Sequence, residues 1–188
     1  ELTTRLQYNG GLGDLPDYDR TTIDTAFALE ALALAGLTET AFEDLYYSLD
    51  FLLQKQNNGG WADNENDISV DVTAIVMYAL WHYRHQLNRF PTLNFEAVLD
   101  QAQAYLLEQL AQGETETFEM ALALIAIIPQ LPHLDGISGH LDTLRAAQLN
   151  NGSWDNDVYT TALALRAIQM SETPEPDPSE PGTNPNNP

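Results

Sequence analysis

The sequence contains no cysteine, which excludes disulfide bonds, thiolate-bound zinc and a cysteine nucleophile. Basic residues are scarce too: seven Lys and Arg stand against 28 Asp and Glu, so the formal net charge is -21. A surface of this charge repels nucleic acid phosphates and anionic lipid headgroups. No apolar run approaches the roughly 18 residues that suggest a membrane span. We therefore expect neither nucleic acid binding nor membrane insertion.

The composition divides the chain into two parts. Hydrophobic residues make up 44% of the 188 residues, an ordinary fraction for a folded globular domain. After residue 171 the sequence changes to alternating prolines with acidic and polar residues, which hold a segment extended and remove backbone donors. We predict a folded domain at 1–171 and a Pro-rich segment at 172–188, which is either an interdomain linker or an arm that docks on a partner.

A short motif that contains glycine and tryptophan recurs along the chain. Residues 148–154 read QLNNGSW, residues 55–61 read KQNNGGW, and a worn copy at 7–12 reads QYNGGL. Their spacing requires another copy near the middle, where 109–113 (QLAQG) keeps a Gln and a Gly but no aromatic residue. Four units are predicted, one of them degenerate, and such units must stack to bury their apolar faces. The motif residues are Gly10, Leu12, Gln56, Gly59, Trp61, Gln148, Gly152 and Trp154.

Apolar residues recur with helical periodicity in seven segments, and no segment reads convincingly as a strand. Thr25, Thr73 and Thr161 occupy the same place in three of the helices and fix their register. Residues such as Ser69 and Asp157 stand where helices begin, and capping the first turn is their default role. The predicted helices cover 21–36, 39–56, 69–87, 94–112, 116–128, 138–149 and 157–170.

The pattern Gln-x-x-x-Gly-x-Trp at 148–154 resembles the QW repeat of squalene-hopene cyclases and oxidosqualene cyclases, which has relatives in protein prenyltransferase beta subunits. The run at 157–167 is more similar to secreted bacterial proteins with prenyltransferase and squalene oxidase repeats. The resemblance covers residues 7–170 and implies an alpha/alpha toroid of inner and outer helices. Seven helices are too few for a complete ring. We expect an all-α, toroid-like repeat of about four helix hairpins that forms an open or partial ring.

Asp71 is the catalytic candidate that this resemblance suggests. Class II terpene cyclases carry Asp-x-Asp-Asp-Thr-Ala at the start of an inner helix, and the matching stretch 69–74 (SVDVTA) keeps only the middle Asp. Protonation of an alkene needs a strong acid whose neighbours stabilise the resulting anion, and Asp71 lacks them in sequence. A carboxylate favoured by the helix dipole explains it more simply. We expect no catalytic residue, and the absence of cysteine excludes the prenyltransferase zinc site.

Acidic residues follow the Gly-Trp turns and predict an acidic rim at one end of the inner helices. Asp63, Glu65 and Asp67 alternate along one loop and offer oxygen ligands for calcium. An EF-hand would need Gly where Ile68 stands and Glu where Ala74 stands. Capping and solvation are the simpler roles. No cofactor is expected, with calcium at these three residues as the open exception.

The chain keeps the structural repeat motif but only one aspartate of the catalytic motif. This combination favours a non-catalytic, extracellular module for binding or assembly within a larger bacterial surface or secreted protein. The chain begins without Met just before a Gly turn, and we expect it to be a piece of a longer protein. We expect its partner to be another protein or a second copy of this chain. In one alternative, the Pro-rich tail makes the contact. Two alternatives stay open: a fragment of a terpenoid-cyclase-like or polysaccharide-processing enzyme, and a calcium-stabilised adhesin module.

Overall fold

The computed structural model describes residues 21–36, 42–63, 67–84 and 92–172. Helices, turns, isolated β-bridges and the short 3-10 helix η3 (Ile128–Gln130) make up these ranges, which contain no β-strand. The predicted all-α class is therefore confirmed. The worn motif copy with Gly10 and Leu12 and the Pro-rich tail lie outside the described residues. The α-helices are α1 (Thr22–Leu34), α2 (Phe42–Lys55), α3 (Val70–Trp81), α4 (Phe95–Gln112), α5 (Thr117–Ile127), α6 (Ser138–Ala146) and α7 (Val158–Glu172).

The helix boundaries match the predicted segments within a few residues, with two differences. Helix α3 ends at Trp81 instead of residue 87. Helix α6 ends at Ala146 instead of residue 149, because the motif that follows forms its own turn: the Leu149 N–H donates to the carbonyl of Ser153 at 2.8 Å. None of the helices in the described ranges is long and apolar enough to cross a membrane.

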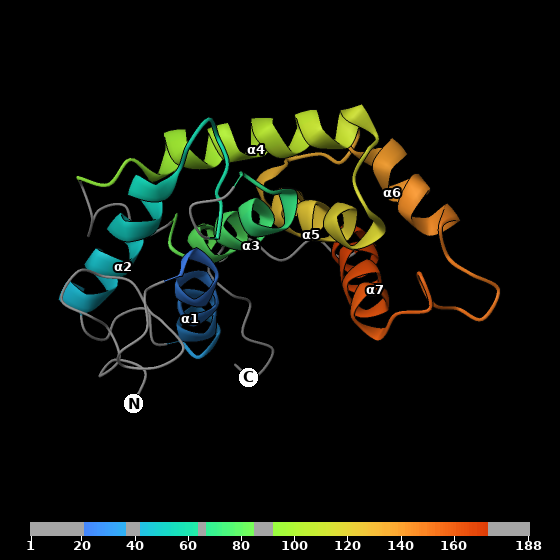
Figure 1. The fold of residues 1–188 in the computed structure, drawn as a ribbon, viewed down its shortest axis with the longest axis horizontal. Helices are drawn as coiled ribbons and strands as arrows, with labels where there is room; N and C mark the ends of the chain where they lie inside the picture. The colour runs from blue at the N-terminus through green and yellow to red at the C-terminus, as the bar shows by residue number, and fades with distance from the viewer. Residues whose placement is uncertain (1–20, 37–41, 64–66, 85–91, 173–188) are drawn as a thin grey trace, which may run out of the picture.

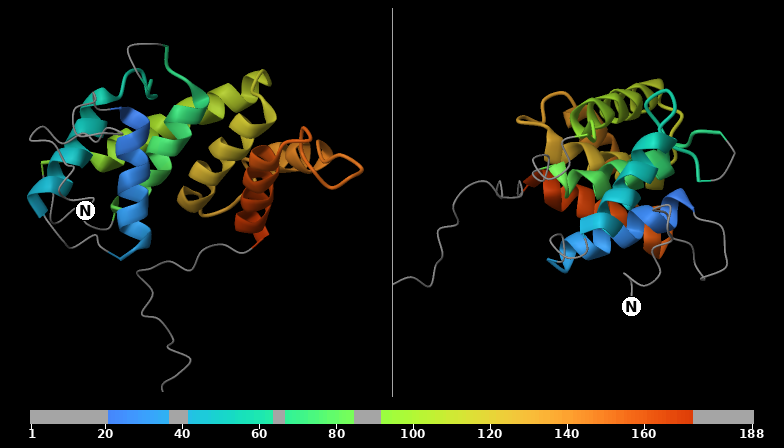
Figure 2. Two further views of the ribbon diagram at one scale, coloured as in Figure 1. Left: turned by 60° about the horizontal axis from the view of Figure 1, so that its bottom comes forward. Right: turned by 90° about the vertical axis from the view of Figure 1, so that its left-hand side faces the viewer.

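Helices of two kinds alternate along the chain (Figures 1 and 2). We call α1, α3, α5 and α7 the inner row, since each packs against the next: α1 on α3, α3 on α5, and α5 on α7. We call α2, α4 and α6 the outer row, since α2 covers α1, α4 covers α3 and α5, and α6 covers α5 and α7. In Figure 1 the molecule is an arc, with α4 along its outer side, α2 and α6 at its left and right, and α1 and α7 on the inner side of these two helices. The arrangement is that of stacked helix hairpins.

The two middle helices of the inner row, α3 and α5, are apolar on almost every face, which explains why they are enclosed. From Ala121 to Ile128 every residue is buried, and α3 is buried from Val72 to Leu80 apart from Ile75, which is partly buried. A helix that is hydrophobic all round must lie in a core. Alanines such as Ala79 and Ala126 are fully buried and let neighbouring helices approach closely.

The two tryptophan-bearing motifs join their helices in the same way. The indole N–H of Trp61 donates to the carbonyl of Leu52 at 2.7 Å, and that of Trp154 donates to the carbonyl of Leu144 at 2.6 Å. Both indoles are buried, and both accepting carbonyls belong to the preceding outer helix. We call the connection from an outer helix to the next inner helix a joint. Each indole fills its joint and donates to a carbonyl near the end of the outer helix, where intrahelical donors are missing.

A threonine at the start of the inner helix completes each of these joints. The backbone N–H of Trp61 donates to Oγ1 of Thr73, and the backbone N–H of Trp154 donates to Oγ1 of Thr161, both at 3.0 Å. In α1 the equivalent Thr25 hydroxyl donates to a backbone carbonyl within its own first turn at 2.8 Å. Thr73 and Thr161 therefore hold the motif against the inner helix.

The degenerate third copy forms a different joint. Helix α4 continues through 109–112 and ends at Gly113, which has a left-handed φ of 72° and donates to the carbonyl of Leu110 at 3.2 Å. Helix α5 begins four residues later, where the Glu116 N–H donates to Oε2 of Glu119 at 2.9 Å. A helix stop with glycine and a helix start with a capping glutamate replace the buried indole.

Candidate functional site

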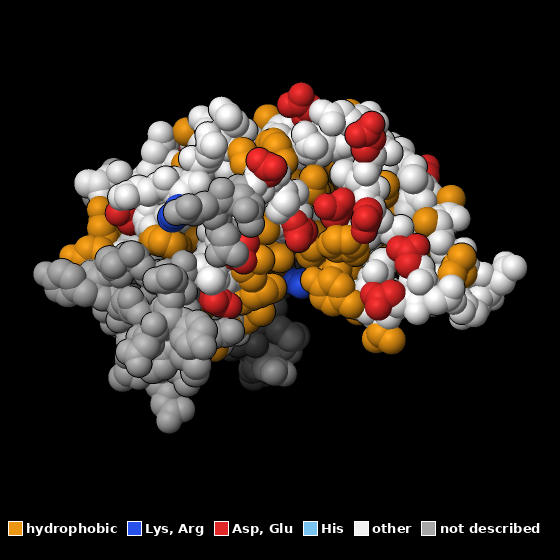
Figure 3. All heavy atoms as spheres, in the orientation of Figure 1, with side chains coloured by type: hydrophobic (Ala, Val, Ile, Leu, Met, Phe, Trp, Pro, Cys, Tyr) orange, Lys and Arg blue, Asp and Glu red, His pale blue; other side chains and the backbone are white. Residues whose placement is uncertain are grey.

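The first turns of the inner helices lie at one end of the molecule, where carboxylates gather. The loop between α2 and α3 reaches the start of α1, since the Ile23 N–H donates to Oδ1 of Asp63 at 3.2 Å. Asp71 at the start of α3 is near enough to Tyr159 at the start of α7 for its charge to add to the rise in the pKa of Tyr159, which burial mainly causes. Figure 3 shows acidic side chains spread across this face of the molecule.

Asp71 lies in the first turn of α3 and is partly exposed. Its charge acts on two phenols, Tyr105 of α4 and Tyr159 of α7, whose pKa values are raised mainly by burial and further by Asp71. Glu119 and Glu108 raise the pKa of Tyr105 in the same sense. Asp71 therefore lies near the phenols of two neighbouring helices.

Asp63, a predicted calcium ligand, has a structural role that its place in the sequence does not reveal. Its Oδ1 accepts the Ile23 N–H, and its backbone carbonyl accepts the hydroxyl of Thr22 at 3.5 Å. It therefore caps a helix of the neighbouring unit. Asp67 is exposed and Glu65 lies outside the described residues. Within the ranges that the structure covers, no three His, Cys, Asp or Glu side chains are grouped so that they could hold a metal ion.

Asp157 caps its own helix, as its place in the sequence predicts, and should make the stability of the domain sensitive to acid. Its Oδ2 accepts the Thr160 N–H at 2.6 Å and the Thr160 hydroxyl at 2.9 Å. These bonds, the backbone one foremost, hold the pKa of Asp157 below its ordinary value of 3.8. Because the folded pKa is the lower one, the stabilisation is complete above the unfolded pKa and is lost as the pH falls through the folded pKa.

We expect an Asp157→Asn variant to keep a capping side chain but to lose this pH dependence. Melting temperatures followed by circular dichroism from about pH 6 to pH 3 should fall less steeply for the variant than for the unaltered domain. Asp155→Asn, an equally exposed change in the same turn, is the matched control and should follow the unaltered domain. Identical pH profiles for all three proteins would contradict the assignment.

Arg166 of α7 crosses the concave side of the arc. Its guanidinium carbon lies 4.9 Å from the ring centroid of Tyr78 in α3, and its Nη2 lies 3.5 Å from Oε1 of Glu30 in α1. In Figure 3 a basic side chain is visible in the hollow between hydrophobic groups. The first and last inner helices are therefore linked across the middle of the row by side chains that occupy the same register position in their helices.

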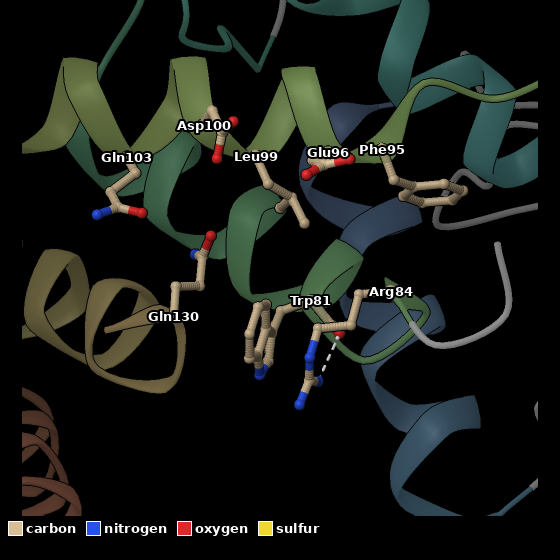
Figure 4. A pocket seen from close by; sticks show the side chains of 8 residues that line it. All are labelled: Trp81, Arg84, Phe95, Glu96, Leu99, Asp100, Gln103 and Gln130. Atoms are coloured by element: carbon tan, nitrogen blue, oxygen red, sulfur yellow. Dashed lines mark hydrogen bonds between the residues drawn. The ribbon is translucent and has the colours of Figure 1, made fainter. Parts of the chain in front are cut away.

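A cavity of about 360 Å³ opens on the other side of α3, between its C-terminal end and α4 (Figure 4). The guanidinium of Arg84 stacks on the indole of Trp81, 3.4 Å from the ring centroid, and its Nη1 donates to the Trp81 carbonyl at 3.0 Å. Helix α4 contributes two carboxylates and one amide, and η3 contributes a second amide. The lining residues are Trp81, Arg84, Phe95, Glu96, Leu99, Asp100, Gln103 and Gln130.

No protein-family model matches the chain, and no curated protein matches it significantly.

Proposed function

We propose that the domain is a non-catalytic assembly and binding module of a larger bacterial secreted or surface protein, built from QW-type repeats. The observation that carries the proposal is a contrast between two copies of the same motif. The joint between α2 and α3 is covered by the next outer helix, whereas the joint between α6 and α7 has no such cover among the described residues.

The contrast is seen at the glutamines and glycines of the two copies. Gln56 donates within its own turn, to the Gly59 carbonyl at 3.3 Å, and also to the carbonyl of Val98 in α4 at 2.9 Å. Gln148, one place earlier in its copy, donates to the Gly152 carbonyl of its own turn at 2.9 Å. A Cβ added at Gly59 would lie 2.7 Å from the Gln101 carbonyl oxygen of α4, whereas one added at Gly152 would meet nothing within 4 Å. The surface that α4 covers in one unit is therefore open in the last one.

Helix α7 exposes the face that other inner helices use to contact their successor. The register is set by the first helical bonds, in which Ser69 and Asp157 accept the N–H groups of Thr73 and Thr161. On this register the exposed positions of α7, Val158 (85% exposed), Ala162 and Leu165 (52% exposed), correspond to buried positions of α3. The corresponding residues of α3 are Val70, Ala74 and Met77.

Helix α1 exposes the opposite face. Phe27 (48% exposed), Ala31 and Leu34 (67% exposed) lie on it. The positions of α7 that match the first two, Leu163 and Ala167, are buried, and α5 is the inner helix that packs against α7. The face exposed by α1 is therefore the one with which an inner helix contacts its predecessor. Complementary faces at the two ends are what a stack of repeats needs in order to continue.

The non-catalytic part of the proposal rests on the acidic end of the inner row. Asp63 and Asp157 accept hydrogen bonds from first-turn amides, and Glu119 accepts one from the backbone at the start of its helix. These three carboxylates have structural roles, and the stretch 69–74 keeps only Asp71 of the three aspartates in the catalytic motif. The secreted bacterial setting comes from the resemblance of the motif to the QW repeats.

Self-association tests the proposal, because each copy of the chain carries both end faces. We expect sedimentation velocity to show association that grows with concentration, and Leu165→Glu to weaken it at least about tenfold, since a carboxylate buried without a partner is strongly unfavourable. Tyr47→Glu is the control, because Tyr47 is as exposed as Leu165 but belongs to the outer helix α2. A chain that stays monomeric at every concentration, or an equal effect of the two variants, would overturn the proposal.

A further inference from the structure

The cavity beside Trp81 has the shape and chemistry of a ligand site that is separate from the end faces of the inner row. Its volume of about 360 Å³ lies within the range of roughly 300–1,000 Å³ that is usual for small-molecule sites. Phe95 and Leu99, both buried, supply its apolar groups, together with the indole of Trp81. The other lining side chains are polar or charged, so the cavity combines an apolar surface with hydrogen-bonding groups.

The indole offers a flat apolar surface to a ligand. Arg84 covers one face of the ring, and in Figure 4 the ring stands between this guanidinium and the amide of Gln130. Trp81 is partly exposed, in contrast to Trp61 and Trp154, which are buried in their joints. The hydrogen bond to the Trp81 carbonyl holds the Arg84 guanidinium over the indole, and this stacking restricts the ring, so less side-chain entropy is lost when a ligand packs on it.

Polar groups are placed around this surface on separate elements. Glu96, Asp100 and Gln103 project from successive turns of α4, and Gln130 comes from η3 (Figure 4). The Nε2 of Gln130 donates to the carbonyl of Ala126 at 3.0 Å, which orients its amide. Two carboxylates accept hydrogen bonds, and amides both donate and accept them, so the site suits a ligand with several hydroxyl groups.

The charges of the cavity select against other ligand classes. Glu96 and Asp100 disfavour an anion, because their like charge would repel it. The guanidinium of Arg84 stacked on the indole disfavours a cation at that ring. A wholly apolar ligand would leave the carboxylates and amides without hydrogen-bond partners.

We propose that this cavity binds a neutral saccharide, with one sugar ring on the Trp81 indole and its hydroxyl groups on Glu96, Asp100 and the two glutamines. The inference goes beyond the assembly role and does not depend on it. A saccharide site between the C-terminal end of α3 and α4 would let an assembled array present several sugar sites, one for each copy.

Tryptophan fluorescence of the intact chain is the direct test. The probes are the methyl glycosides of glucose, galactose, mannose and N-acetylglucosamine, with cellobiose and maltose as larger sugars. Two of the three tryptophans are buried, so a saturable change would report on Trp81. We expect at least one probe to bind, and Glu96→Gln and Asp100→Asn each to weaken its binding at least about fivefold, since each removes a hydrogen bond to a charged acceptor.

Three further variants make the test specific. Glu108→Gln, an exposed change on α4 outside the cavity lining, should leave the affinity unchanged. Trp81→Phe should abolish the fluorescence change while calorimetry still detects weaker binding. Leu165→Glu should bind the sugar normally, which separates this site from the association surface. The proposal is overturned if no probe binds at tens of millimolar, if Glu108→Gln weakens binding as much as Asp100→Asn, or if arginine methyl ester binds in preference to every sugar.

Discussion

Replacing Trp61 with alanine is expected to lower the free energy of unfolding by about 3–5 kcal/mol, the usual cost of truncating a large buried aromatic side chain. The indole is wholly buried between α2 and α3, and its loss leaves a cavity at the joint. It also removes the 2.7 Å hydrogen bond to the Leu52 carbonyl. Urea denaturation followed by circular dichroism at 222 nm measures the change directly.

Trp81→Ala is the matched control for this prediction. It removes the same side chain from a partly exposed position on α3, where the indole makes no joint between helices. We expect it to cost less than half as much as Trp61→Ala. If the two variants are equally stable, the buried indole is not what holds the helix pair together.

The second large effect is expected at Gly59. This residue has a φ of 84°, which costs a residue with a side chain about 1–2 kcal/mol. A new Cβ would also approach the Gln101 carbonyl oxygen to 2.7 Å and the Cβ of Tyr105 to 3.3 Å. Crowding of this kind typically adds about 1–3 kcal/mol. The summed loss of unfolding free energy in Gly59→Ala should therefore approach the whole stability of a marginally stable domain.

Gly152 allows the two contributions to be separated. Its φ of 85° matches that of Gly59, but a Cβ added there would have no neighbouring atom within 4 Å. Gly152→Ala should therefore show only the conformational cost, about 1–2 kcal/mol in the same denaturation experiment. Equal losses of stability at the two positions would mean that α4 shifts to accommodate the added methyl group, and that its packing on Gly59 does not stabilise the turn.

The helices and their order could be predicted because their signals are local. Apolar periodicity, the glycine turns and the threonine register each act within a few residues, and the structure places α1 to α7 where they indicate. The surroundings of a residue that depend on packing against another repeat unit could not be predicted. Gly59 and Gly152 are equivalent in the motif, but only Gly59 is pressed against a following outer helix. The sequence motif contains no information about which unit ends the row.

The candidate sites show the same limit. Asp63 resembles a calcium ligand in sequence because acidic residues alternate around it, while the amide that it caps belongs to a helix 40 residues earlier. The cavity proposed to bind a saccharide draws its polar groups from α4, from η3 and from Arg84 just after α3, and no spacing in the sequence links them. Trp81 stands out as an aromatic residue of an inner helix, but its neighbours Glu96, Asp100 and Gln130 have the pattern of ordinary surface residues.

The joint between α4 and α5 has a consequence for the order of folding. Its stop signal at Gly113 and its start signal at Glu116 and Glu119 are complete within the connection itself, whereas the other two joints require an indole to find its place in a packed interface. A short connection also has the smallest loop-closure entropy. The unit that lost its tryptophan is therefore the one best able to form first, and the better-preserved units can assemble on either side of it.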